Sequence, residues 1–475
     1  MRSCPLYLNG AFVETGLTMP VVNPATGETF ARMSVCGRDV VARALQDADV
    51  AFGAWRQVAG RARGEALLRV AAEVENRKDE IARTITLENG KPLPQSKGEV
   101  GMTLDHLRWF AEEARRGYGR IVPPQLSSKR HLIIKTPIGV VGAISPWNFP
   151  LVLAVRKIAP ALAAGCPVVL KPAGATPVCA AIFAECVHAA GLPAGVFQLV
   201  AGKASEIGAE LLENPRCRKI TFTGSTEVGK QLIAGAAQSV KPLSLELGGC
   251  APLLVFDDCD LMNAVEVAVL AKFRNTGQSC IAANRIYVQR GVHDRFLEML
   301  ADAARALKVG NGLDEGVEIG PMINEAAVAS ALRRIDDARA HGARVVVGGQ
   351  RPGHLPRGFL EPTVLADVDD SCLCFREETF APIAPVARFD SESEAIARAN
   401  AVPFGLSAYA CTRDLGRTFR LMEGLEAGMI AINDGLPTTS QCPFGGVKQS
   451  GWGRELGVEG MDAFLETKHV SLGIL

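Results

Sequence analysis

The stretch that decides the fold is VVGAISPWNFPLVLAVRKIAPALAAGCPVVLK, residues 140–171. It opens with an apolar run, continues through an amphipathic segment over 151–164 that stops at Gly165, and closes with a second apolar run. Glycine commonly ends a helix because it adopts the left-handed conformation at little steric cost. Apolar runs without in/out alternation indicate strands that are covered on both faces. The stretch therefore predicts a β-α-β unit inside a parallel sheet.

Two β/α series extend outward from this unit. The first continues through a helix over 176–190, the strand VFQLV, a short helix over 205–213, and the strands KITFT and SLEL. The second runs from Leu253 to Asn433 and alternates strands such as RIYVQ, IAPVARF and SAYACT with helices. We therefore predict an α/β protein with a twisted, mostly parallel sheet and a second α/β domain.

The rest of the chain lies outside both series. The first 120 residues combine a glycine-punctuated hairpin region with helices over 38–55 and 62–77. Strand-like segments occur at 130–136 and 464–472. Exposed segments of this kind commonly pair with another copy of the same protein. We therefore expect a homo-oligomer, either a homodimer or a homotetramer.

Composition excludes several classes of protein. The 475 residues carry 51 Lys+Arg against 51 Asp+Glu, so no basic excess is available for nucleic acid. No apolar stretch approaches the roughly 20 residues of a membrane span, and the N-terminus does not resemble a signal peptide. The 13 cysteines contain no CxxC pair, and Cys372 and Cys374 lack the second half of a zinc site. We expect a reduced cytoplasmic protein without a bound metal, whose partners are small molecules or copies of itself.

Two segments could bind a phosphate-bearing ligand. KITFT is followed by GSTEVG, residues 224–229, which places glycines around a helix start, where free N–H groups attract phosphate. The spacing is not G-x-G-x-x-G, so an ordinary strand-to-helix turn is at least equally compatible. Lys171 follows a strand at the carboxyl edge of the same sheet, where such folds bind ligands, although a surface lysine is the simpler interpretation.

Three residues could carry nucleophilic chemistry. Cys280 ends the small-residue loop TGQSC, which leaves its thiol reachable. Glu246, in ELGG, offers a base at a strand end. Asn148, in PWNFP, could donate to an oxyanion or cap a turn. Taken singly, residues in such settings are structural more often than catalytic.

Seven motifs in fixed order make a family resemblance specific. Together they are similar to the aldehyde dehydrogenase superfamily over nearly the whole chain. The resemblance implies a modified Rossmann cofactor domain over 1–120 and 141–249, a catalytic domain over 250–433, and an oligomerisation element over 121–140 and 434–475. The motifs are PWNFP, VVLKPA, FTGSTEVG, LELGG, FRNTGQSC, EETFAPI and PFGGVKQSGWGRELG.

The same resemblance implies roles for the three candidate catalytic residues. Cys280 would be the nucleophile that forms a thiohemiacetal and then a thioester. Asn148 would stabilise the oxyanion, and Glu246 would activate the water that releases the carboxylic acid.

The resemblance also implies contacts to NADP or NAD. Many NAD-preferring relatives carry a glutamate at the position of Gly174, which repels a 2′-phosphate; its absence here favours dual use with a lean to NADP. Gly229 belongs to the helix-start turn. The remaining contacts are expected from Trp147, Lys171, Ser225, Glu378 and Phe380.

Within the family, the chain most resembles the succinate-semialdehyde dehydrogenases. That likeness places Arg156, Arg274 and Thr438 around the substrate's distal carboxylate, for which the planar guanidinium suits well. Solvated arginines on a helix face are the alternative. Pro437 and Thr438 depart from the succinate-specific pattern, so glutarate semialdehyde or another carboxylated or aromatic aldehyde stays open. A cofactor-binding protein without catalysis is disfavoured by the joint presence of Cys280, Glu246 and Asn148.

Overall fold

The stretch 140–171 folds into strand β8 (Val140–Ile144), helix α5 (Val152–Ala164) and strand β9 (Val168–Lys171) of a computed structural model that describes residues 1–474. Every residue of α5 and β9 is buried, as expected of elements without a solvent face. Gly165 ends α5 at φ 99°, the left-handed conformation that favours glycine. The predicted β-α-β unit is confirmed.

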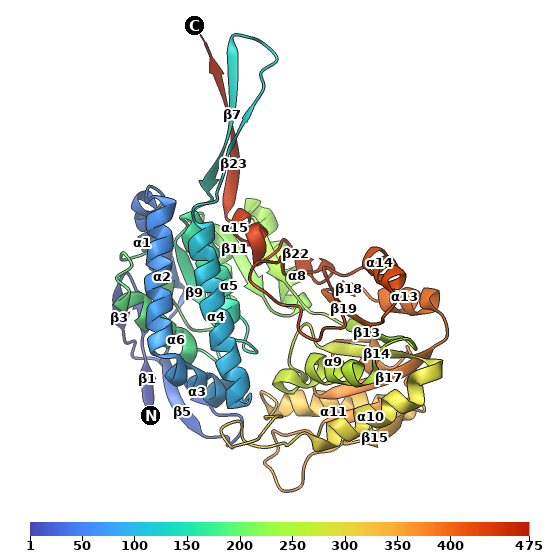
Figure 1. The fold of residues 1–475 in the computed structure, drawn as a ribbon. Helices are drawn as coiled ribbons and strands as arrows, with labels where there is room; N and C mark the ends of the chain where they lie inside the picture. Colours follow the sequence, from blue (N-terminus) through green and yellow to red (C-terminus); the bar gives the residue numbers. More distant parts are fainter. Residues whose placement is uncertain (475) are drawn as a thin grey trace.

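An eight-stranded sheet is built around this unit, in the order β22-β12-β11-β8-β9-β10-β2-β3 (Figure 1). Its five central strands are parallel, as predicted, and antiparallel strands close both edges. One face packs on α1, α7 and α8, and the other on α5 and α6 with α2, α3 and α4 outside them. The additional strands are β2 (Leu6–Leu8), β3 (Ala11–Val13), β10 (Phe197–Leu199), β11 (Cys217–Thr223), β12 (Leu243–Glu246) and β22 (Gly451–Trp452).

Besides α5, seven further helices of the described chain belong to this unit. They are α1 (Arg38–Trp55), α2 (Gly60–Asn76), α3 (Lys78–Asn89), α4 (Leu93–Glu113), α6 (Val178–Ala189), α7 (Ala204–Glu213) and α8 (Thr226–Ala236). A small separate sheet, β1-β5-β4, precedes them, with β1 at Arg2–Cys4, β4 at Thr18–Val22 and β5 at Thr29–Ser34.

A seven-stranded sheet forms the second α/β unit, in the order β15-β16-β17-β14-β13-β19-β20. All neighbouring pairs are parallel except β15 and β16. Its strands are β13 (Ala251–Val255), β14 (Ala283–Gln289), β15 (Arg344–Val347), β16 (Thr363–Ala366), β17 (Ile383–Phe389), β19 (Ser407–Cys411) and β20 (Met429–Ile432). Its helices are α9 (Leu261–Phe273), α10 (His293–Ala306), α11 (Glu325–Ala340), α12 (Leu373–Arg376), α13 (Glu392–Asn400) and α14 (Leu415–Gly424).

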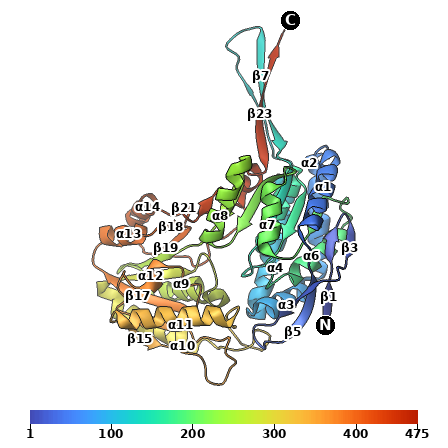
Figure 2. The ribbon, with the colours of Figure 1, turned by 180° about the vertical axis from the view of Figure 1, so that it is seen from behind.

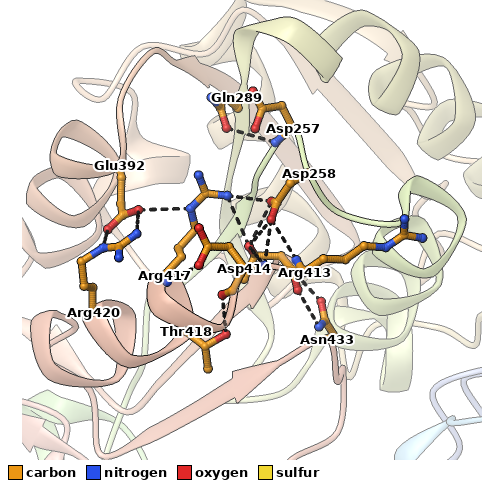
Figure 3. A network of polar contacts seen from close by, with 11 residues as sticks. Asp257, Asp258, Gln289, Glu392, Arg413, Asp414, Arg417, Thr418, Arg420 and Asn433 are labelled. Carbon is orange, nitrogen blue, oxygen red and sulfur yellow. Dashed lines mark hydrogen bonds and ion pairs between the residues drawn. The ribbon is translucent and has the colours of Figure 1, made fainter.

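A polar network fastens α13 and α14 to the second sheet (Figure 3). Asp258, just beyond β13, accepts hydrogen bonds from the backbone N–H groups of Arg413 and Asp414 and from the Arg417 guanidinium. Arg417 also reaches Glu392 at the start of α13. The network satisfies the charges at the helix starts and holds the two helices in place.

A three-stranded antiparallel sheet projects from the body of the molecule (Figures 1 and 2). It consists of β6 (Arg120–Val122), β7 (Lys129–Pro137) and β23 (Leu465–Gly473), and β23 pairs with β7 from Leu465↔Pro137 to Gly473↔Lys129. The projecting sheet matches the strand-like segments 130–136 and 464–472.

The rest of the expected element 434–475 lies elsewhere. Strand β22 pairs with β12 in the first sheet, and β21 (Val447–Lys448) pairs with β18 (Phe404–Gly405). Helix α15 (Gly457–Asp462) packs on α5. The segment 434–464 therefore bridges the two α/β units instead of joining the projecting sheet. The sequence pattern alone does not show which segments join the projecting sheet and which bridge the two units, because β21, β22 and α15 are short.

None of the helices described over residues 1–474 is both long enough and apolar enough to cross a membrane. All thirteen cysteines are free thiols. Cys372 lies near Asp337 of α11 and near His341, which follows that helix, but Asp337 accepts a hydrogen bond from the Leu373 N–H at 2.7 Å and so caps α12.

Candidate active site

The carboxyl ends of four parallel strands meet at one edge of the first sheet. Pairing aligns Ile144 of β8 with Lys171 of β9, and Thr223 of β11 with Glu246 of β12. The segments that follow these strands carry Trp147, Asn148 and Ser225. The sheet therefore gathers most of the predicted cofactor and catalytic residues along the edge where doubly wound folds bind ligands.

Cys280 reaches this edge from the second unit, on the loop between α9 and β14. Asn275, Thr276 and Gly277 all have positive φ values, of 52°, 59° and 72°. A side chain at Gly277 would collide with the backbone oxygen of Ala381. The Asn275 amide donates to the backbone oxygens of Asn148 at 2.9 Å and of Gln278 at 3.1 Å. A strained backbone held by buried hydrogen bonds is typical of a functional loop.

Two cavities meet at Cys280. The larger cavity, of about 220 Å³, is lined by Trp147, Asn148, Ser225, Glu378 and Phe380 besides Cys280. The smaller cavity, of about 30 Å³, is lined by Arg156, Arg274, Thr438, Phe149 and Phe444 besides Cys280. Cys280 thus lies between the predicted cofactor contacts and the predicted substrate contacts.

Both α/β units supply walls of the larger cavity. The Trp147 and Phe380 rings lie edge to face with centroids 5.5 Å apart. Ser225 caps α8 by accepting a hydrogen bond from the Val228 N–H at 3.4 Å. Glu378 accepts one from the Gly249 N–H at 3.1 Å, and burial of its carboxyl raises its pKa to about 7.

Three predicted cofactor residues lie outside the lining of the larger cavity. Lys171 is buried at the end of β9, where its ammonium donates to the Pro172 oxygen at 3.1 Å and burial lowers its pKa. Gly174 is exposed, with the Met19 thioether as its nearest neighbour. Gly229 packs so closely against Leu247 that a side chain there would collide with it. Gly229 therefore sets the distance between α8 and the strand end.

Glu246 is buried at the end of β12, and its Oε2 atom has no hydrogen-bond partner in the described chain. Burial, and then the nearby Glu455, raise its pKa well above 4.5. A carboxylate with a raised pKa accepts a proton readily. Its unpartnered oxygen marks a place for a group that the protein itself does not provide.

The surroundings of Cys280 favour its thiol over its thiolate. Burial raises its pKa to about 12, the carboxylates of Glu378 and Glu246 add to that rise, and Arg156 opposes it. Since the thiolate is the nucleophilic form, the thiol must lose its proton when the reaction begins.

The Asn148 side chain is fixed in place. Its amide nitrogen donates to the Gln278 oxygen at 3.1 Å, and its backbone oxygen accepts from Lys91 at 2.7 Å. An amide nitrogen carries two N–H groups, so one remains for another acceptor.

The smaller cavity is cationic. Arg156 comes from α5 and Arg274 follows α9, and aromatic rings lie 4.4 Å and 4.8 Å from their respective guanidinium carbons. Burial lowers the pKa of both side chains. Over residues 1–474 neither guanidinium forms an ion pair with a carboxylate. Two desolvated cations without a counter-ion favour binding of an anion.

Sequence reasoning missed several residues of this site. Phe149 and Phe444 flank the two arginines, buried His106 contacts Arg156, and Ser440 contacts His106. No local pattern could have indicated the pair His106 and Ser440, because they lie 334 residues apart in the chain.

Comparisons with known proteins show what the whole chain is similar to. The aldehyde dehydrogenase family model matches residues 12–470. A glutarate-semialdehyde dehydrogenase of Pseudomonas aeruginosa is 49% identical over 98% of this chain and 97% of its own length. The NADP(+) succinate-semialdehyde dehydrogenase of Escherichia coli K12 is 47% identical over 98% of this chain and 97% of its own. The crystal structure of an E. coli NADP-dependent enzyme superposes with a TM-score of 0.98 at 46% identity, covering 99% of this chain and 98% of that one.

Proposed function

The chain belongs to the aldehyde dehydrogenase family, and on that premise we propose that it oxidises succinate semialdehyde to succinate with NADP or NAD. The choice of substrate rests on Arg156 and Arg274, whose guanidinium groups form no ion pair with a carboxylate of the described chain. Both line the smaller cavity, which meets the larger cavity at Cys280. A terminal carboxylate held there leaves the aldehyde end to reach the sulfur.

The larger cavity fits the nicotinamide end of the cofactor. Its walls are mainly apolar, with Trp147 and Phe380 facing each other, and its volume of about 220 Å³ suits part of a dinucleotide. Ser225, Glu378 and Lys171 lie at the same sheet edge for ribose and phosphate contacts. When bound, the nicotinamide accepts the hydride that the oxidation releases.

Acylation begins with proton loss from Cys280. Solvent water takes the proton, and the thiolate sulfur attacks the aldehyde carbon. The new oxyanion accepts hydrogen bonds from the spare Asn148 N–H and the Cys280 backbone N–H. Loss of hydride from the thiohemiacetal carbon leaves a thioester on Cys280.

Deacylation uses the Glu246 carboxylate. Glu246 removes a proton from water, the resulting hydroxide attacks the thioester carbon, and the carboxylic acid leaves as Cys280 regains its proton. The unpartnered Oε2 of Glu246 is available to bind this water. Retention of this base disfavours transfer of the acyl group to coenzyme A.

Glutarate semialdehyde is the alternative substrate. It has one methylene more than succinate semialdehyde, and a relative with that name is 49% identical to this chain. Arg156 and Arg274 in the smaller cavity suit the terminal carboxylate of both substrates, so relative kcat/KM decides between them. One methylene more or less in an apolar pocket changes kcat/KM by about 10- to 200-fold.

A substrate panel tests the proposal. Succinate semialdehyde, glutarate semialdehyde, butanal and benzaldehyde are compared by kcat/KM, with each cofactor. The proposal expects the semialdehydes to exceed butanal by at least about tenfold, with succinate semialdehyde first. Equal values for butanal and both semialdehydes would contradict it, whereas a lead for glutarate semialdehyde would select the alternative.

The projecting sheet is proposed to join copies of the chain into a dimer or tetramer. It exposes large apolar side chains, among them Ile121 at 75% and Leu472 at 45% exposure, and within residues 1–474 the outer edges of β6 and β23 have no strand partner. Light scattering after gel filtration measures the assembly. Ile121→Lys should shift it toward monomers, and a monomeric native protein would contradict the proposal.

A further inference from the structure

A buried chain of hydrogen bonds runs away from the smaller cavity, behind Arg156. Arg156 Nε lies 3.2 Å from His106 Nε2, and His106 Nδ1 lies 2.7 Å from Ser440 Oγ. Ser440 Oγ in turn contacts the Asp105 carboxylate. Arg156, His106 and Ser440 are each less than 5% exposed, so water does not compete for the two contacts that join them, whereas Asp105 lies at the surface.

The chemistry of the four groups fixes the direction of every bond. A guanidinium only donates, so His106 Nε2 must accept and carries no proton. His106 Nδ1 then holds the ring proton and donates it to Ser440, whose hydroxyl donates to Asp105. His106 is thereby held as one neutral tautomer. Burial, and then the charge of Arg156, keep its pKa well below 6.5.

The contact with His106 decides which edge of Arg156 faces the cavity. His106 occupies the Nε–H group, and the Phe444 ring lies against the guanidinium with its centroid 4.4 Å from Cζ. In the described chain the Nη nitrogens of Arg156 have no acceptor. The outer edge with its two Nη groups is therefore left for a bidentate anion.

A second buried arginine shows the contrast. Arg285 donates from Nε, Nη1 and Nη2 to the backbone oxygens of Cys250, Arg398 and Ala399, which leaves it no free edge. Arg285 is a structural cation, whereas Arg156 has a single protein acceptor. A cation with one fixed edge and one free edge is arranged to receive a ligand.

The chain of hydrogen bonds also joins two walls of the substrate site. Asp105 and His106 lie on α4, which supplies Met102 to the smaller cavity, and Ser440 lies two residues beyond Thr438 of the same cavity. We propose that His106 is the positioning residue that orients Arg156 and ties it to the loop of Thr438, so that the site selects aldehydes with a terminal anion. The inference rests on the proposed function and deepens it.

Three variants of His106 separate a positioning role from a packing role. Gln retains an acceptor near the place of Nε2, Asn retains only a polar group near Nδ1, and Leu retains neither. We expect His106→Asn and His106→Leu to raise KM for succinate semialdehyde about tenfold. His106→Gln should stay within about threefold of the native value. KM for butanal and kcat for both aldehydes should change by less than about twofold.

A variant at Ser440 tests the same chain of bonds without altering the histidine. Ser440→Ala removes the acceptor of the Nδ1 proton and should raise KM for succinate semialdehyde by about two- to threefold, again sparing butanal. Circular dichroism verifies that each variant is folded. If His106→Leu fails to fold, the Asn and Gln pair with Ser440→Ala decides the matter.

The possible outcomes are distinct. Equal KM values for the Gln and Asn variants, or a parallel loss with butanal, would overturn the positioning role. Native enzyme that does not distinguish succinate semialdehyde from butanal would instead refute the proposed function, and the positioning role with it. Selectivity retained by the native enzyme and unchanged in every His106 variant would refute the positioning role alone.

Discussion

The two cavities that meet at Cys280 differ in size and in charge. The larger has a volume of about 220 Å³ and presents the Glu378 carboxyl and strand-end backbone. The smaller has a volume of about 30 Å³ and presents Arg156 and Arg274 between aromatic rings. Glu246 lines neither cavity, although its charge contributes to the raised pKa of Cys280. The Glu378 carboxyl and the two guanidinium groups thus lie in different cavities that share one thiol. This sorting orients a substrate that is anionic at one end and electrophilic at the other.

Replacing Cys280 removes the one thiol that both cavities share. Cys280→Ala should lower kcat by roughly 10³-fold or more, because no other described group lines both cavities as a nucleophile. Reduced-cofactor absorbance measures the rate. Cofactor binding, followed by quenching of tryptophan fluorescence, should persist because the larger cavity keeps its walls. A turnover number equal to that of the native protein would refute the assignment of the nucleophile.

Neutralising the base breaks the carboxylate side. Glu246→Gln should lower steady-state turnover by about 10²- to 10³-fold. In the native enzyme the base acts when ionised and its pKa is raised by burial and by Glu455, so activity is present above that pKa and falls as the pH drops through it. The pH profile of kcat should lose this limb in Glu246→Gln. An unaltered profile would assign the base elsewhere.

Removing a cation breaks the arginine side. Arg274→Ala should raise KM for succinate semialdehyde by about 10- to 100-fold, since a charge-assisted contact is lost, while KM for butanal stays within about twofold. Arg274→Lys, which keeps the charge but not the planar fork, should lie between the two. Parallel increases for both aldehydes would show that Arg274 supports the fold and not the anion.

A single added charge sharpens the description of the cofactor side. Gly174 is exposed and has space for a side chain, because Met19 lies 3.8 Å from the position of a Cβ atom. Gly174→Glu should lower kcat/KM for NADP by about tenfold through repulsion of the 2′-phosphate, with NAD changed less than about twofold. Gly174→Gln is the matched neutral control. Equal losses with both cofactors would place Gly174 away from the ribose.

Local pattern predicted the parts of the fold that repeat. Buried apolar runs and glycine helix ends indicated β8, α5 and β9, and the shared edge of parallel strands follows from them. Helix α11 was not predicted, because its buried positions include the small Ala331 and Ala338, which give a weak apolar stripe. The bridging path of 434–464 was also missed, since β22 and β21 are only two residues long.

In the candidate site too, some residues could be predicted from local pattern and others could not. Cys280, Glu246 and Asn148 stood out because loops and strand ends carry them, and the structure brings Cys280 and Asn148 to one cavity. His106 and Ser440 could not be predicted, because a histidine on the buried face of a helix is ordinarily a core residue. Their partnership depends on folding that joins positions 334 residues apart.

The central claim is that Cys280 carries the acyl group while an anion is held on the arginine side. The most direct test mixes Glu246→Gln with succinate semialdehyde and cofactor, quenches the reaction, and locates the adduct by peptide mass spectrometry. A succinyl thioester, an increase of about 100 Da, is expected on Cys280 in near-stoichiometric amount. No adduct, or one on the exposed Cys442 instead, would contradict the account.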